Sequence, residues 1–307
     1  MTEIYHKEHL LDRAAMVAMR AMIALHPAVD LSPNGRAAFD DLMGRTPPAD
    51  TVTYEAAEIG GVPGWWCRAP GATPGVAILY FHGGAYVVGS AQAYRNFVGQ
   101  IAARAKVDAF IADYGLAPER PFPMAVEDGE AVYRGLVSAG ISRIAIVGDS
   151  AGGGLALVIA TRMTAAARDG AVPKPVAAVV LSPWTDLALT GESMTTRAGH
   201  DPLLTREALE QARIAYLGAV DPEDPRASPL YGDLAGLPPV MLHVGEDEIL
   251  LADARRMADS IVAAGSTAEL HVWQGMVHVF PANLALLKAA TEALDIVATF
   301  VRLNLRG

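Results

Sequence analysis

The sequence is poor in cysteine, in charged residues and in long apolar runs. Its single cysteine, Cys67, cannot form an internal disulfide, which fits a reducing compartment or a fold large enough to need no crosslink. Lysine and arginine total 24 residues against 34 aspartates and glutamates, which gives a formal net charge of −10. Without a basic surplus the chain lacks the surface that binds phosphate backbones, so we expect no nucleic-acid partner.

No stretch of the sequence is apolar enough to predict a membrane span. The run from Ala14 to Leu25 comes nearest, but Arg20 interrupts it, and acidic residues precede it where a secretory signal carries positive charge. The spacing of its methionine, valine and isoleucine residues instead predicts an amphipathic helix. The expectation is therefore a cytoplasmic protein without a membrane span.

The sequence does have a large apolar fraction, because 52% of its 307 residues are hydrophobic. From Val76 onward, short apolar runs alternate with helical segments, a pattern typical of parallel strands buried on both faces. Two further strand-like runs, 51–59 and 65–69, predict an antiparallel pair at one edge. Together they predict an α/β fold with a mostly parallel eight-stranded sheet and helices on both faces. Crossover helices are expected to start near Asn96, Met124, Ala151 and Leu251, with a closing helix from Asn283 to about Leu305.

Residues 185–236 break this alternation. They hold helix-like pieces, prolines and an acidic loop, without a run that reads as a core strand. We interpret them as an insertion that forms a helical cap, which the N-terminal helix joins. The expected organisation is 1–50 as N-terminal cap helices, 51–184 and 237–307 as the core, and 185–236 as the cap insertion.

One strand-like run ends in the pattern G-x-S-x-G, from Gly148 to Gly152 with Ser150 at its centre. In a sharp turn between a strand and a helix the serine backbone is strained, and its neighbours must be tiny. Such a turn lifts the Ser150 hydroxyl clear of the sheet, and the N–H of Ala151 points to where negative charge develops during attack on a carbonyl. A nucleotide-binding glycine loop is the alternative, but the spacing does not match its fingerprint.

A second glycine element, "FHGGAY" from Phe81 to Tyr86, follows another predicted strand. Its adjacent glycines allow a close backbone approach and leave the Gly83 and Gly84 amides able to donate, as the other half of an oxyanion hole. We interpret His82 as a structural hydrogen-bonding residue rather than a base, because it lies on this side of the site.

A serine nucleophile needs a base that takes its proton, and the base needs a third group to hold it. In the chain order Ser, acid, His, the base follows the last strand. His278 lies in the loop after that strand, whereas His271 and His243 lie inside strands, so His278 is the expected base. The loop after the preceding strand offers three carboxylates between which residue type cannot choose: Glu246, Asp247 and Glu248.

The motifs resemble those of the bacterial hormone-sensitive-lipase family of α/β-hydrolase esterases. They are "HGGAY", "YGLAPE", "PFPMAVED", "GDSAGG", "GEDEILLAD" and "GMVHVF", which span the chain from about Val76 to its end. The family pattern G-x-x-[DE]-x-L designates Glu248 as the acid, with Asp247 as the alternative. The sequence departs from the family at Ala85, where a third glycine is usual, and at Gly115, where arginine is usual.

The resemblance implies a carboxylic ester hydrolase that acts on short-chain acyl esters through a triad of Ser150, His278 and Glu248 and an acyl-enzyme. It implies a small-molecule ester as partner, no metal or organic cofactor, a possible homodimer, and a cap that shapes the acyl pocket. A lactone hydrolase with the same triad is the near alternative. A non-catalytic receptor of the same fold, like the plant gibberellin receptors, is the distant one, and the presence of His278 argues against it. The expected pocket walls are Trp184, Leu203 and Leu204.

Overall fold

The computed structural model describes residues 1–25 and 29–306; residues 26–28 and 307, which belong to the expected first and last segments, lie outside the described residues. In the described part, nine strands form one sheet in the order β1-β9-β8-β7-β6-β4-β5-β3-β2. The strands are β1 (Thr2–His6), β2 (Thr53–Ile59), β3 (Val62–Arg68), β4 (Val76–Phe81), β5 (Ala109–Ala112), β6 (Arg143–Asp149), β7 (Ala177–Leu181), β8 (Val240–Gly245) and β9 (Ala268–Trp273).

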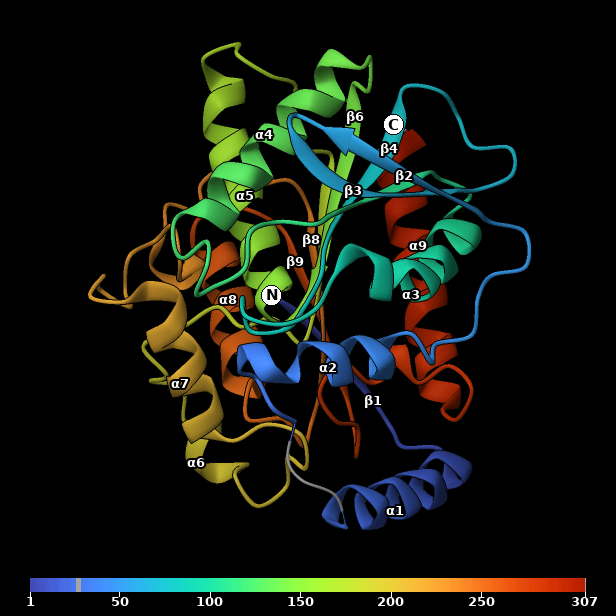
Figure 1. Ribbon diagram of the computed structural model, residues 1–307, viewed down its shortest axis with the longest axis vertical. Helices are drawn as coiled ribbons and strands as arrows, with labels where there is room; N and C mark the ends of the chain where they lie inside the picture. Colours follow the sequence, from blue (N-terminus) through green and yellow to red (C-terminus); the bar gives the residue numbers. More distant parts are fainter. Residues whose placement is uncertain (26–28, 307) are drawn as a thin grey trace.

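Helices cover both faces of this sheet, as expected. Figure 1 shows α3 and α9 on one face and α4, α5 and α8 on the other. Alternate residues of each central strand point into the two apolar layers between sheet and helices, so the strands are apolar throughout. The helices are α1 (Leu10–Ala24), α2 (Arg36–Met43), α3 (Ala91–Ala105), α4 (Met124–Ser138), α5 (Ser150–Arg168), α6 (Ser193–Thr196), α7 (Arg206–Leu217), α8 (Leu251–Ala263) and α9 (Lys288–Arg306).

In the described residues the sheet has nine strands rather than eight. The expected antiparallel pair is present as β2 and β3 at one edge. The additional strand, β1, occupies the opposite edge and runs parallel to β9, with Thr2 opposite Glu269 and His6 opposite Trp273. A five-residue strand that pairs with a strand more than 250 residues away carries little local signal, which is why the sequence pattern missed it.

The segment between β7 and β8 contains α6, α7 and a 3₁₀ turn, and no strand in its described residues. Its start is tied to the core, because the Asp253 carboxylate on α8 accepts the backbone N–H groups of Thr185 and Asp186, both at 2.9 Å. Figure 1 shows α6 and α7 at one end of the sheet, the end that also carries α1 and α2. The division of the chain into core and cap stays a prediction.

Cys67 lies in β3 and is fully buried. Burial raises the pKa of its thiol to about 12, so the reactive thiolate is scarce at neutral pH. The side chain therefore packs as a small apolar group.

Among the described residues, no helix combines the length and the hydropathy that crossing a membrane requires.

Candidate active site

Ser150 stands at the junction of β6 and α5. Its φ of 53° is left-handed, a conformation that costs free energy for any residue with a side chain. The flanking glycines make the turn possible, because a Cβ at Gly152 would overlap the carbonyl oxygens of Phe81 and His82. The sequence therefore holds the hydroxyl at the carboxyl end of the sheet on a backbone that is strained but tightly packed.

The structure brings Ser150, His278 and Glu248 into one hydrogen-bonded chain. His278 Nε2 lies 2.9 Å from Ser150 Oγ, and His278 Nδ1 lies 2.9 Å from Glu248 Oε2. The three residues follow β6, β9 and β8, whose carboxyl ends meet at one edge of the sheet. Ser150 is 7% exposed and Glu248 is completely buried, so these contacts are shielded from bulk water.

The surroundings of His278 shift the pKa of its imidazole. Burial lowers its pKa, but the hydrogen bond and negative charge of Glu248, helped by the charges of Asp201 and Asp149, outweigh this effect. The net result is a pKa raised above the usual value of histidine. A more basic imidazole at this position is suited to accept the proton of the Ser150 hydroxyl.

The other two carboxylates of the acid loop point elsewhere. Asp247 forms an ion pair with Arg20 of α1, with 2.6 Å between Oδ2 and Nη2. Glu246 accepts a hydrogen bond from the Tyr5 hydroxyl in β1 at 3.0 Å. Glu248 is thus the member of this triplet that contacts His278, while its neighbours bind the N-terminal segment.

The remaining histidines near the sheet lie in other surroundings. His271 and His243 stack on each other inside β9 and β8, with ring centroids 4.4 Å apart. His82 bonds through Nδ1 to the Gly83 carbonyl oxygen at 2.7 Å and stacks on Tyr114. Within the described residues, His278 is the histidine that reaches the Ser150 hydroxyl.

The Gly83 amide is not available to an oxyanion, contrary to the expectation. Its N–H donates to Asp149 Oδ1 at 2.9 Å, which occupies its single backbone donor. The amides of Gly84, Ala85 and Ala151 donate to no acceptor in the part of the chain that the structure describes. Gly84 and Ala85 both have positive φ angles, 118° and 54°, which turn these amides away from the hydrogen-bonding pattern of a regular strand.

Sequence reasoning also missed Asp149, although it stands inside the serine motif. This fully buried carboxylate accepts hydrogen bonds from the hydroxyls of Tyr80 and Tyr94, at 2.8 and 3.0 Å. It also accepts the bond from the backbone N–H of Gly83. Burial raises its pKa. Asp149 therefore ties the glycine loop after β4 to the turn that carries Ser150.

Gly115 is the second departure from the family pattern, and the space beside its backbone is filled by other side chains. Its amide donates to Asp128 Oδ2 at 2.8 Å, and Arg120 binds the same carboxylate through two hydrogen bonds of 2.7 and 2.9 Å. A Cβ at Gly115 would lie 2.8 Å from Cβ of Arg120. The Arg120 side chain thus occupies the space next to this backbone, which accounts for glycine there.

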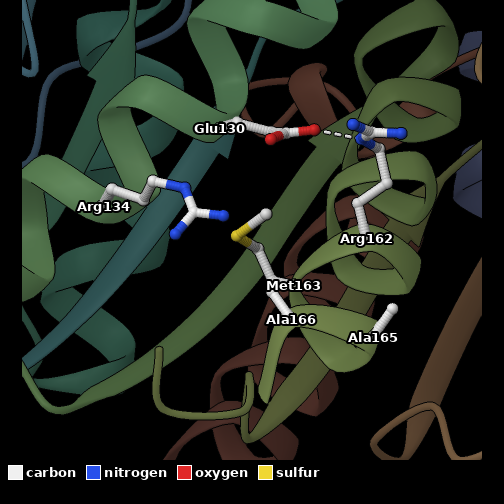
Figure 2. Close-up of a pocket in the computed structure, with 6 residues that line it drawn as sticks. All are labelled: Glu130, Arg134, Arg162, Met163, Ala165 and Ala166. Atoms are coloured by element: carbon white, nitrogen blue, oxygen red, sulfur yellow. Dashed lines mark hydrogen bonds and ion pairs between the residues drawn. The ribbon is translucent and has the colours of Figure 1, made fainter. Parts of the chain in front are cut away.

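A separate cavity of about 240 Å³ lies between α4 and α5 (Figure 2). Its walls carry Arg134 and an ion pair between Glu130 and Arg162, with Met163 at its side. Met163 is 13 residues along α5 from Ser150, or about 20 Å at 1.5 Å per residue, so this cavity is not part of the serine site. In the described ranges, no three His, Cys, Asp or Glu side chains cluster so that they could hold a metal ion.

Comparison with known proteins shows which family has this sequence and fold. Residues 78–282 match the model of a family described as having the alpha/beta hydrolase fold. A solved esterase from the bacterial hormone-sensitive lipase family superposes with a TM-score of 0.89 and 39% identity, covering 97% of this chain and 99% of its own. The chain belongs to the bacterial hormone-sensitive-lipase family of α/β-hydrolase esterases.

Curated relatives agree with this assignment. An acetyl-hydrolase from Streptomyces hygroscopicus is 38% identical over 83% of this chain and 83% of its own length. An esterase from Acinetobacter venetianus is 35% identical over 92% of this chain and 93% of its own. The protein is therefore a serine carboxylesterase with the α/β-hydrolase fold.

Proposed function

We propose that the esterase hydrolyses short-chain acyl esters, with Ser150 as nucleophile, His278 as general base and Glu248 as the acid that orients it. The observation that carries this proposal is the 2.9 Å contact between His278 Nε2 and Ser150 Oγ, which is the geometry that proton transfer requires. The contact of His278 Nδ1 with Glu248 fixes the tautomer in which Nε2 accepts.

The chemistry follows from these contacts. His278 takes the Ser150 proton as Oγ attacks the ester carbonyl, and a tetrahedral intermediate with a negative oxygen forms. Collapse of this intermediate expels the alcohol, which receives the proton from His278, and leaves an acyl group on Ser150. Water, deprotonated by His278, attacks this acyl-enzyme, and a second collapse releases the acid and restores the serine hydroxyl. Glu248 stabilises the imidazolium in both halves.

For the oxyanion we propose the amides of Gly84, Ala85 and Ala151. Their support is that each is a backbone N–H without a protein acceptor in the described residues, placed beside the turn that carries Ser150. Loss of one such donor costs about 10²–10³ in kcat in serine hydrolases. Ala85 takes part through its backbone, so the missing third glycine of the family does not remove a donor.

The preference for short acyl groups is supported by the enclosure of the site and by a relative. Ser150 is 7% exposed, and the expected wall residues Trp184 and Leu204 are buried, with Leu203 half-buried. The relative from Streptomyces is called an acetyl-hydrolase, which is the smallest common acyl class. A lactone hydrolase would use the same three side chains, and a panel of p-nitrophenyl esters of increasing acyl length together with lactones separates the two.

The Ser150→Ala variant tests the nucleophile. We expect its kcat on p-nitrophenyl acetate to fall by about four to six orders of magnitude, because the variant lacks the hydroxyl that forms the acyl-enzyme. A serine-directed phosphonate should label the wild-type protein on the peptide that contains Ser150 and leave the variant unlabelled, as read by mass spectrometry. Wild-type turnover by this variant would overturn the proposal, and the absence of any labelling would favour a binding protein.

A further inference from the structure

Ser182 directly follows β7, and its buried side chain contacts Glu248 and the backbone that follows His278. Its hydroxyl donates to Glu248 Oε1 at 2.7 Å and accepts the backbone N–H of Val279 at 3.0 Å. Its own N–H donates to the His243 carbonyl oxygen in β8 at 2.7 Å. One small residue therefore joins the loops that carry the acid and the base.

The hydroxyl completes the hydrogen bonding of a carboxylate that is wholly buried. Glu248 Oε2 contacts His278 Nδ1, while Oε1 accepts from Ser182 and from the Gly245 amide at 2.6 Å. An ionised carboxylate without water needs such donors, and they also fix the direction in which each oxygen points. Without the hydroxyl, Oε1 keeps only the Gly245 amide, and the carboxylate can rotate away from the imidazole.

The second bond of the hydroxyl acts on the other partner. Val279 follows His278 and has a φ of 49°, a left-handed conformation that is unfavourable for a β-branched residue. The bond from its N–H to Ser182 Oγ helps to hold this backbone, and with it the position of the imidazole.

We propose that Ser182 is a positioning residue that holds Glu248 and His278 in register, so that it controls kcat without contacting the substrate. The inference rests on the proposed function of these two residues. It requires a side chain that donates and accepts at once, which serine and threonine supply and alanine does not.

The test compares Ser182→Ala with Ser228→Ala. Ser228 is an equally buried serine whose hydroxyl also makes one donated and one accepted bond, to the Pro222 carbonyl oxygen and the Leu187 amide, but contacts neither Glu248 nor His278. With p-nitrophenyl acetate, we expect Ser182→Ala to lower kcat by about ten- to a hundredfold with KM within twofold. Ser228→Ala should leave kcat within about twofold.

A second measurement reports directly on the contact between Glu248 and His278. The proton on His278 Nδ1, shared with Glu248, gives a downfield proton resonance in NMR, which should shift or broaden in Ser182→Ala and stay unchanged in Ser228→Ala. Ser182→Thr restores both bonds and should regain at least a third of the wild-type kcat, although its branched side chain lowers the midpoint of thermal unfolding at a φ of 49°. If the alanine variant does not fold, Ser182→Gly removes the same hydroxyl and suits the backbone better.

The outcomes separate this inference from the function on which it rests. An inactive Ser150→Ala together with wild-type kcat and an unmoved resonance in Ser182→Ala would overturn the role of Ser182 alone. An active Ser150→Ala would overturn the proposed function first. A change confined to KM in Ser182→Ala would also contradict the inference, since His278 acts in both acylation and deacylation and its misplacement should lower kcat whichever step is slower.

Discussion

Asp247 and Glu248 are neighbours in the chain, yet they have different partners. Glu248 points inward to His278, and Asp247 points outward to Arg20. Glu248 is completely buried, whereas Asp247 is partly exposed. Their separate surroundings support the separate roles that we propose for the two carboxylates, although their chemistry is nearly the same.

We expect Glu248→Gln to lower kcat by about 10³–10⁴, because an amide cannot stabilise the imidazolium and can hold the wrong tautomer. Asp247→Asn keeps a similar shape and should lower kcat less than tenfold, since its contact is with α1. Steady-state kinetics on p-nitrophenyl acetate measure both variants. A larger loss in Asp247→Asn than in Glu248→Gln would show that the acid has been assigned to the wrong residue.

Among single residues, the sequence predicted those whose place depends on a local pattern. The glycines around Ser150 and the position of His278 after the last strand are local features, and the structure brings these two residues together. The direction of the Glu248 side chain is not local, so only the family pattern could select it. The expectation for Gly83 was wrong because the sequence shows that its amide is unhindered but not that the Asp149 carboxylate, from a neighbouring strand, accepts from it.

Among the elements, α7 of the segment between β7 and β8 reaches the loop after β4. Tyr216 of α7 stacks on Tyr86, with ring centroids 3.9 Å apart and planes within 4°. Tyr86 ends the glycine loop and has a φ of 63°, next to Ala85 at 54°. A buried aromatic stack therefore covers a strained loop, and the loop carries two of the proposed oxyanion donors.

We expect Tyr216→Ala to lower kcat about tenfold or more and to reduce the free energy of unfolding by about 3–5 kcal/mol, the usual cost of removing a buried aromatic ring. Tyr216→Phe keeps the stack and should stay within twofold of wild type, because the Tyr216 hydroxyl has no hydrogen-bond partner in the described residues. Kinetics and urea unfolding measure the two effects. A folded alanine variant with wild-type kcat would mean that α7 does not support the loop.

The presence of the helices could largely be predicted from the sequence, but the residues at which they begin could not always be. The helices expected near Met124 and Leu251 begin there, because apolar periodicity is a strong local signal. The closing helix was expected from Asn283 and begins at Lys288. Its first turn is set by Asp12 of α1, whose carboxylate accepts the N–H groups of Lys288 and Ala289, both at 2.8 Å. A cap supplied from the other end of the chain leaves no trace in the local sequence.

For the whole molecule, a stack of imidazoles fastens the N-terminal strand to the sheet. His6 of β1 hydrogen-bonds His271 of β9 at 2.8 Å and stacks on Trp273, and His271 stacks on His243 of β8. Burial lowers the pKa of all three histidines, although Glu292 acts against this at His6 and Glu269 at His271. The lowered pKa values favour the neutral form of these rings in the native protein at neutral pH.

The sign of the pH dependence follows from this lowering. The unfolded chain binds protons at about pH 6.5, where the native rings do not, so their contribution to stability is complete above that pH. It is lost as the pH falls through their lowered native pKa values. We expect the free energy of unfolding of the wild type to fall from pH 7.5 to 5.5 by more than that of His6→Phe, which keeps the stack on Trp273. Urea unfolding measures this difference.

Carboxylates with raised pKa values, such as Asp253 with a pKa of about 7, change the free energy of unfolding with pH in the opposite direction. They are present in both proteins, so they cancel in the comparison. Equal pH dependence in the wild type and His6→Phe would contradict a role for the β1 contact in acid sensitivity.

The pairing of β1 with β9 also bears on how the molecule is made. The ribosome produces β1 long before β9, so β1 cannot pair with its neighbouring strand until β9 has emerged. His278 leaves the ribosome later still, more than a hundred residues after Ser150. Ester turnover by nascent chains should therefore begin only after the segment that carries His278 has emerged and folded, long after Ser150 has left the ribosome.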